Sequence, residues 1–326
     1  MLLLNACSQA PESSLSAGLW SDYRHAYIRA DGRVVDDGQQ GISHSEGQGY
    51  AMILAEAADD RATFDRVWSW THSHLQVRED ALLAWKWDPE IDGVVDMNNA
   101  TDGDLLIAWA LLRAARRWEI PAFHSEAREI TQDIRSQLIV ETSIGPVLLP
   151  GVAGFIHGGV VTINLSYWIF PALTELDGLE PDGPWAALKK SGLVLLEVAR
   201  FGAQGLPADW VVMSDPPVPS PLFPNRFGFE ALRIPLYVNW DGMTGHPALD
   251  SLVTFWGRDA YPPAWVDLDD GSHASVNLRP GAMAVRRLLL TNGRDAQDGR
   301  TPVMPVNDYY DSTLMLLANV AASENN

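Results

Sequence analysis

One run of the sequence, residues 105–112, would present no polar face at all if it formed a helix. It reads Leu-Leu-Ile-Ala-Trp-Ala-Leu-Leu, and the first charged side chain after it is Arg113. A helix that is apolar on all sides must be covered on most of them. Two layers of helices, an inner and an outer one, provide that cover, whereas a bundle of amphipathic helices does not.

The rest of the chain repeats the helical pattern. Apolar residues recur at spacings of three and four in residues 48–58, 63–75, 104–118, 123–139, 184–200, 246–257, 275–292 and 308–322, and more weakly in 17–29, 164–176 and 229–240. Short β-like pieces, such as 147–149 and 158–161, are too few for a main sheet. We therefore predict one all-α domain over residues 16–326, a toroid of about eleven or twelve helices paired in hairpins, with a few short strands in its loops.

The charge balance narrows the choice of partners. The 326 residues include 42 acidic and 23 basic side chains, which gives a net charge of −19. Such a surface repels phosphate backbones and anionic lipid, so it argues against nucleic acid and leaves a neutral polymer, a cation or a protein. No apolar stretch approaches the ~18 residues of a membrane-spanning helix. The 13 Trp residues fit either a core or stacking platforms for sugar rings.

We predict that residues 1–15 are a separate N-terminal tail. Leu4, Asn5 and Ala6 precede Cys7, the single cysteine, and a polar run follows it. This order resembles the end of a secretory signal with a lipid-modified cysteine, although the charged start and most of the apolar core are missing. We expect either the remainder of a signal or a disordered tail. We further expect export to the periplasm, with a lipid anchor through Cys7 as an alternative to a free protein.

The first candidate site residue is Glu46. Ser45 and Gln48 have the spacing of a capping box, which predicts that a helix begins there. Glu46 then falls in the first turn, beside Gly47 and Gly49, which leave space for a ligand. The alternative is a glutamate that has no role in chemistry and is simply stabilised by the helix dipole. A role as proton donor requires burial, because burial raises the pKa that a helix N-terminus lowers.

The second candidate is Asp102. Thr101 and Asp104 again have capping-box spacing, so Asp102 between them has no capping role, and Gly103 follows where a side chain would crowd a ligand. The alternatives are a solvated acidic loop or a calcium-like cluster, but the spacing of an EF-hand is absent.

A third group combines Glu230 with Arg233, three residues apart on a predicted helix, where they could simply pair on its surface. Polar and aromatic candidates accompany these motifs, although any single aromatic pair belongs more often to a core: Trp85, Trp87, Asn164, Tyr167 and Tyr309. The sequence lacks a phosphate-binding loop, a His-Glu-x-x-His motif and a Gly-x-Ser-x-Gly elbow, which leaves nucleotide, zincin and α/β-hydrolase chemistry without support.

Taken together, these stretches resemble glycoside hydrolase family 8. Residues 100–118 fit the signature of that family from end to end, and residues 45–50 resemble its acid-bearing motif. Further stretches follow in the order of the branch associated with bacterial cellulose synthase operons: 149–151, 164–167, 207–211, 226–237 and 309–310. The resemblance covers residues 20–317, almost the whole chain.

The resemblance implies an (α/α)6 barrel and an inverting endo-hydrolase of β-1,4-glucan that uses no metal or organic cofactor. It implies Glu46 as the general acid and Asp102 as the side chain that binds the sugar ring at the cleavage point. Arg233 would orient the base, and Asn164 would bind substrate. The aromatic rings of Trp85, Trp87, Tyr167 and Tyr309 would line the glucan cleft.

The base is where this chain departs from the family pattern. Related enzymes show Tyr-Asp-Ala, an apolar residue and Arg, whereas this chain has Phe229-Glu230-Ala231-Leu232-Arg233. Glu230 keeps the carboxylate and is our candidate base, but it is longer by one methylene. Two alternatives stay open. The same fold could act on another β-linked glycan, such as xylan, lichenan or chitosan, or it could be a weakly active glucan-binding component of cellulose export.

Overall fold

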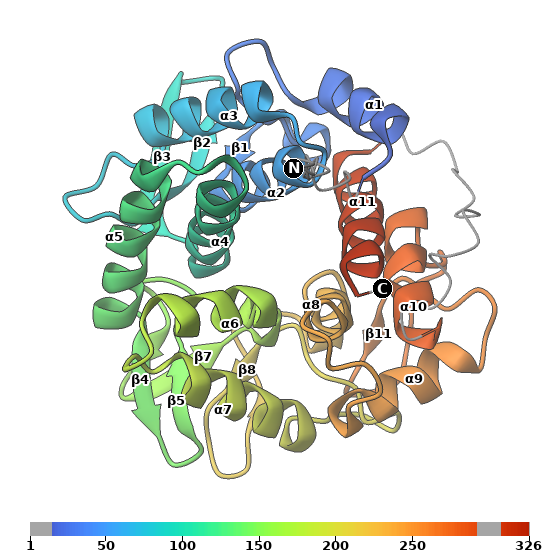
Figure 1. Cartoon of the computed structure of the whole chain (residues 1–326). Helices are drawn as coiled ribbons and strands as arrows, with labels where there is room; N and C mark the ends of the chain where they lie inside the picture. The colour runs from blue at the N-terminus through green and yellow to red at the C-terminus, as the bar shows by residue number, and fades with distance from the viewer. Residues whose placement is uncertain (1–14, 292–307, 326) are drawn as a thin grey trace, which may run out of the picture.

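The computed structural model describes residues 15–291 and 308–325, so the predictions for Cys7 and the N-terminal tail lie outside the described residues. The helices form two concentric rings (Figure 1). The inner ring consists of α2 (Ser45–Ala57), α4 (Thr101–Trp118), α6 (Phe170–Leu179), α8 (Ile234–Trp240) and α11 (Tyr309–Glu324). The outer helices are α1 (Ala17–Tyr27), α3 (Arg61–His74), α5 (Pro121–Gln137), α7 (Trp185–Val198), α9 (Asp250–Gly257) and α10 (Pro280–Thr291).

Burial follows the two layers. In α2 every residue except Glu46 is buried, and in α4 the whole stretch 101–112 is buried. Outer helix α5 buries one face only, through Phe123, Ala127, Ile130, Thr131 and Ile134. The all-round apolar pattern of residues 105–112 therefore marks an inner helix, and the predicted helix-rich, two-layer fold is confirmed.

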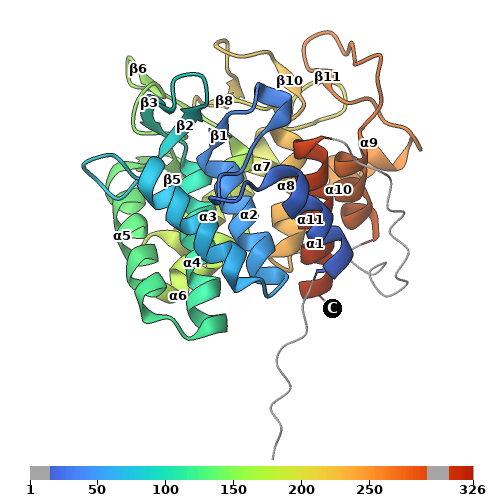
Figure 2. The same cartoon turned by 90° about the horizontal axis from the view of Figure 1, so that it is seen from above.

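Short antiparallel strands occupy the connections and gather mostly at one end of the ring (Figure 2). Three of the sheets are β1 (Ser43–His44) with β2 (Ala84–Asp88) and β3 (Gly93–Asn99), β4 (Ile139–Thr142) with β5 (Gly145–Leu148), and β10 (Arg226–Phe227) with β11 (Val266–Asp267). The fourth joins β6 (Ile156–His157), β7 (Val160–Ile163), β8 (Val211–Val212) and β9 (Val218–Pro219). None of these sheets is large enough to organise the fold. Within residues 15–291 and 308–325 there are also four 3₁₀ turns: η1 (Asp37–Gln39), η2 (Leu165–Tyr167), η3 (Ala231–Arg233) and η4 (Pro247–Leu249).

The two predicted capping boxes are wrong. The residue before α2 is His44, whose Nδ1 accepts the N–H of Gly47 at 3.0 Å, while the Gln48 side chain is buried and donates to Thr71 Oγ1 at 2.6 Å. At α4 the Thr101 hydroxyl donates to the Leu149 carbonyl instead of capping the helix. Both side chains hold distant segments together, because each helix start is enclosed by the rest of the fold.

At the end of the ring opposite the strands (Figure 2), charged side chains link the inner helices. Arg113 on α4 donates to Glu56 at the end of α2 at 2.6 Å and to Glu324 at the end of α11 at 2.5 Å. Glu324 also accepts the indole N–H of Trp240 from α8 at 2.7 Å. Four inner helices are thus tied to one another at this end. Among the described residues, none of the helices combines the length and apolar character needed to cross a membrane.

Candidate active site

Glu46 and Asp102 both lie in the first turn of an inner helix, at the end of the ring where the strands gather. The two helix starts touch at Gly103, where a Cβ would stand 2.8 Å from the backbone nitrogen of Glu46. Glycine at this position therefore allows the two acidic turns to lie side by side.

Arg233 connects the three predicted carboxylates. Its Nη1 contacts Glu46 Oε1 and lies 3.7 Å from Asp102 Oδ2, and its Nη2 contacts Glu230 Oε2. The arginine is 3% exposed, so these contacts form away from bulk water. A planar guanidinium can meet two carboxylates through different nitrogens. The structure thus brings Glu46, Asp102, Glu230 and Arg233 into one cluster.

The Glu46 carboxyl lies between aromatic and polar neighbours. Tyr50, one turn further along α2, donates its hydroxyl to Glu46 Oε1 at 3.0 Å, and its own oxygen lies 2.7 Å from that of Tyr237. His44 Nδ1 lies 3.8 Å from Glu46 Oε2. With 18% of its side chain exposed, Glu46 is held in place yet still reachable.

Glu230 sits immediately before the 3₁₀ turn η3 and reaches across to η2. Its Oε2 accepts Asn164 Nδ2 at 3.1 Å and Ser166 Oγ at 3.4 Å, and Arg233 Nη2 also donates to Ser166 Oγ at 3.0 Å. The side chain is 32% exposed, more than those of the other two carboxylates. Asn164, predicted to bind substrate, therefore contacts Glu230 directly.

The pKa values of two of these acids are raised. Burial raises the pKa of Asp102 to about 7, although its own turn donates the Gly103 N–H to it. Burial, together with the nearby negative charges of Asp102 and Asp209, raises the pKa of Glu230 to about 8. Desolvation and like charges both disfavour the ionised form. The cluster can therefore hold and exchange protons in the neutral range, as acid–base chemistry requires.

The predicted aromatic residues divide into two pairs. Trp85 and Tyr167 are half-buried: the indole N–H of Trp85 donates to Asp96 at 2.9 Å, and Tyr167 packs edge-on against Trp210. Trp87 is buried between Arg33 and Trp70.

Tyr309 is buried as well, among Tyr23, Tyr27 and His44. Core packing takes the rings of Trp87 and Tyr309, so the structure does not present either ring to a ligand.

Five residues of the cluster were missed by sequence reasoning: Tyr50, Ser166, Asp209, Tyr237 and Tyr310. Tyr310 is the neighbour of Tyr309, and its hydroxyl donates to the Phe229 carbonyl at 2.6 Å. All five fall inside stretches that carried the family resemblance, but nothing in their spacing reveals which side chain faces the acids. Among the described residues, no three or more His, Cys, Asp or Glu side chains stand close enough to hold a metal ion.

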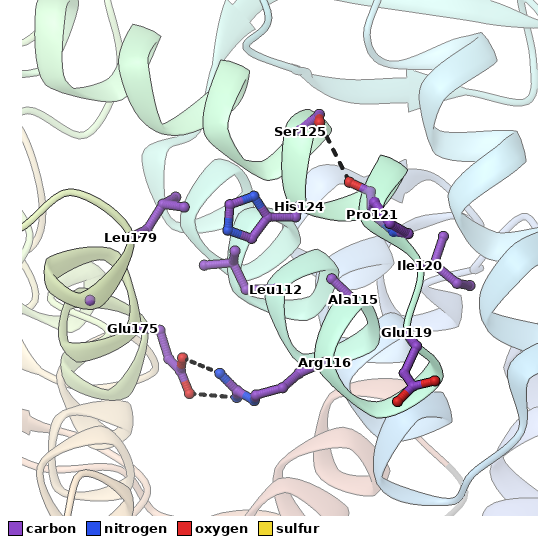
Figure 3. A pocket seen from close by; sticks show the side chains of 11 residues that line it. Leu112, Ala115, Arg116, Glu119, Ile120, Pro121, His124, Ser125, Glu175 and Leu179 are labelled. Atoms are coloured by element: carbon purple, nitrogen blue, oxygen red, sulfur yellow. Dashed lines mark hydrogen bonds and ion pairs between the residues drawn. The ribbon is translucent and has the colours of Figure 1, made fainter.

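A pocket lies elsewhere, between the end of α4, the start of α5 and α6 (Figure 3). Its wall includes Ala115 and a bidentate pair between Arg116 and Glu175, with distances of 2.6 and 2.7 Å. At ~1.5 Å rise per residue, Ala115 is about 20 Å along α4 from Asp102. This pocket is therefore separate from the acidic cluster.

The comparisons with known proteins decide the family. The sequence matches the family described as "Glycosyl hydrolases family 8" over residues 1–324. The chain belongs to glycosyl hydrolases family 8. It is a glycosidase by membership, and the all-α barrel that this family resemblance implied agrees with the ring of helices in Figure 1.

Relatives within family 8 are similar over nearly the whole chain. A probable endoglucanase of Novacetimonas hansenii is 37% identical over 322 residues, which cover 96% of this chain and 93% of the relative. The endoglucanase Cel10 of Klebsiella pneumoniae has a TM-score of 0.89 at 33% identity and covers 95% and 100% of the two chains. The endo-β-1,4-glucanase CMCax of Acetobacter xylinum has a TM-score of 0.88 at 36% identity and covers 97% and 99%.

Proposed function

We propose that this family 8 protein is an endo-acting hydrolase of β-1,4-glucan that works with inversion. The observation that carries the proposal is the contact of one buried arginine, Arg233, with both Glu46 and Glu230. Most glycoside hydrolases use a pair of carboxyl groups, and this cluster contains two that are partly exposed. The endoglucanase names of relatives along almost the full chain support the choice of glucan.

In the proposed mechanism Glu46 donates its proton to the glycosidic oxygen as the bond from that oxygen to the anomeric carbon breaks. Glu230 takes a proton from a water molecule, whose oxygen bonds to the anomeric carbon from the opposite face. An inverting pair stands ~6.5–9.5 Å apart to leave room for this water. Asp102, at the same cluster, hydrogen-bonds the sugar ring at the cleavage point and helps hold it in a distorted shape.

Glu230 can serve as the base despite the change from aspartate. Its longer side chain meets Asn164 and Ser166, so its carboxyl has fixed partners. Fixed partners matter because a displacement near 1 Å can cost about a hundredfold in rate. The raised pKa makes the ionised form of Glu230 a stronger base, which becomes available as the pH rises toward about 8.

The test is a substrate panel of carboxymethylcellulose, lichenan, xylan and chitosan, with release of reducing ends as the readout. We expect the highest turnover on carboxymethylcellulose and products of inverted anomeric configuration by NMR. Glu46→Gln should lower kcat by about 10²–10⁴-fold, which is the usual contribution of a general acid. Highest turnover on another polymer would move the substrate to that glycan, and no release from any would favour a glucan-binding component.

Location and partners form a second part of the proposal. We infer export to the periplasm from the segment that ends at Cys7, and a role beside the cellulose export machinery from the resemblance to the cellulose synthase branch of the family. Cell fractionation of the protein expressed from its natural gene tests the export. Labelling with a radioactive fatty acid in wild type and in Cys7→Ser tests the lipid anchor. Recovery in the cytoplasm without label would contradict both.

A further inference from the structure

Asp209 is a buried carboxylate beside the cluster that the mechanism above does not use. It lies just before β8, is 4% exposed, and reaches the turn 228–231 that carries Glu230. Its Oδ1 accepts the backbone N–H groups of Gly228 and Ala231, both at 2.9 Å. These two residues flank Phe229 and Glu230, so one oxygen atom fixes the backbone on both sides of the proposed base.

Other contacts strengthen the hold on this turn. Asp209 Oδ2 faces Arg226 Nε at 3.3 Å, and the Asp209 N–H donates to the Arg226 carbonyl at 2.8 Å. Gly228 makes the approach possible, because a Cβ there would stand 2.9 Å from Asp209 Oδ2. On the other side of the turn the Tyr310 hydroxyl holds the Phe229 carbonyl. The backbone of the turn is therefore held from two different elements.

We propose that Asp209 is a positioning residue for Glu230: it holds the turn 228–231 through two backbone N–H groups and thereby places Glu230 Oε2 against Asn164, Ser166 and Arg233. This inference rests on the proposed role of Glu230 as the base. A carboxylate gives stronger bonds to N–H groups than a neutral acceptor does. The negative charge of Asp209 also acts directly on Glu230.

The electrostatic effect adds a second signature. Asp209 is one of the groups that raise the pKa of Glu230, after burial and Asp102. The other groups around Glu230 are Arg233 on its own turn, Glu46 on the far side of that arginine, and the phenols of Tyr167, Tyr237 and Tyr310. Removal of the charge on Asp209 leaves all of these in place, so the pKa of Glu230 should fall.

Two substitutions separate the two effects. Asp209→Asn keeps an oxygen that can accept both N–H groups but removes the charge, whereas Asp209→Ala removes both. A matched control is Asp60→Ala, because Asp60 accepts the Thr63 N–H at 3.0 Å at the start of α3, away from the acidic cluster. The control loses a turn-fixing carboxylate without any change near Glu230.

The first readout is the titration of Glu230 itself, followed by NMR of full-length protein labelled with ¹³C at the glutamate carboxyls and assigned by comparison with Glu230→Gln. In wild type we expect a midpoint near pH 8, and in Asp209→Asn a midpoint at lower pH. The Asp60→Ala control should titrate as wild type does. Equal midpoints in wild type and Asp209→Asn would overturn the electrostatic part of the proposal.

The second readout is the kinetics on carboxymethylcellulose. We expect Asp209→Ala to lose about a hundredfold in kcat with little change in KM, because a misplaced base affects the chemical step more than binding. Asp209→Asn should recover part of that loss. A kcat loss in Asp209→Ala no greater than that in Asp60→Ala would overturn the positioning role. If wild type hydrolyses no glucan, the proposed function fails. The NMR titration still tests whether Asp209 acts on Glu230, because it does not depend on activity.

Discussion

Gly103 packs directly against Ser45, so closely that a Cβ on Gly103 would stand 2.1 Å from Ser45 Oγ. The same Cβ would approach the backbone nitrogen of Glu46, so the side chain of Ser45 cannot relieve the clash alone. We expect Gly103→Ala to push the starts of α2 and α4 apart and to displace Glu46 from Asp102. The expected result is a lower Tm and a kcat reduced by about a hundredfold, since small displacements of reacting groups are costly.

The matched control for this substitution is Gly178→Ala. Gly178 also lies in a helix, in the last turn of α6, but a Cβ there meets nothing within 4 Å. Alanine is favoured over glycine in a helix by up to ~1 kcal/mol, so this variant should keep wild-type activity and gain slightly in Tm. Thermal unfolding and kcat measured side by side provide the check. Equal behaviour of the two variants would contradict the tight packing at Gly103.

Arg233→Lys tests the shared contact in the acidic cluster. Lysine keeps the charge but has one compact ammonium group, which cannot meet Glu46 and Glu230 through separate nitrogens as the guanidinium does. We expect kcat to fall by about a hundredfold through loss of geometry, with a lower Tm because the two partly exposed acids lose part of their contact with the buried cation.

Arg116→Lys is the control for that experiment, because Arg116 forms a similar bidentate pair with Glu175 at the other end of α4. Arg116 is exposed, and pairs of that kind contribute about 0–1 kcal/mol. Its kcat and Tm should stay near wild type. An Arg233→Lys variant with full kcat would show that the bridge between the two acids is dispensable.

Glu230→Asp tests whether the longer side chain suits this chain. The substitution introduces the aspartate that the family resemblance implies at this position, but it draws the carboxyl back from Asn164 and Ser166. We expect kcat to fall by about one to two powers of ten from this displacement, while Glu230→Ala should abolish turnover. Steady-state kinetics on carboxymethylcellulose measures both. A Glu230→Asp variant faster than wild type would mean that the backbone here still fits aspartate, and near-normal turnover by Glu230→Ala would move the base elsewhere.

Asp104 should make the stability of the fold depend on pH. It is completely buried, and burial raises its pKa from 3.8 to about 7. Between these values the folded chain keeps a proton that the unfolded chain has lost, so the contribution of this group to stability falls as the pH rises from about 4 to 7. We expect the Tm of wild type to decline over this range more steeply than that of Asp104→Asn. Parallel curves would contradict the prediction. The absolute Tm of the variant does not decide it, because asparagine keeps only one oxygen to accept from Leu83 or from Asn99.

The helices were predictable because an inner helix leaves a strong local signal. Residues 105–112 must be covered whatever surrounds them, and the 3.6-residue period of the outer helices is plain in a segment such as α5. The helix starts were less predictable, because the side chains at those positions bond to partners far away in sequence. Gln48 is the clearest case. Its spacing from Ser45 predicts a cap, whereas in the structure its side chain donates to Thr71 and accepts the Val34 N–H.

The three acids were predicted from the family resemblance, and the structure gathers Glu46, Asp102 and Glu230 around Arg233. The aromatic residues were harder, because a ring in a core and a ring facing a sugar look alike in sequence. Tyr309 and Tyr310 are neighbours, yet Tyr309 packs among core rings and Tyr310 reaches the backbone of Phe229. Asp209 shows a further limit, since its contacts with the turn 228–231 are to backbone N–H groups, which no residue pattern reveals.

The cluster draws on nearly the whole length of the chain, from Glu46 on α2 to Tyr310 on the last helix, α11. During synthesis, the residues that surround the base are incomplete until that last helix has emerged and docked beside α2 and α8. A nascent or shortened chain that ends before α11 would thus contain the acids without the contact that Tyr310 makes beside Glu230. Catalytic competence in this protein should consequently be the last property to arise during biogenesis, and its onset should mark the completed closure of the circle of helices.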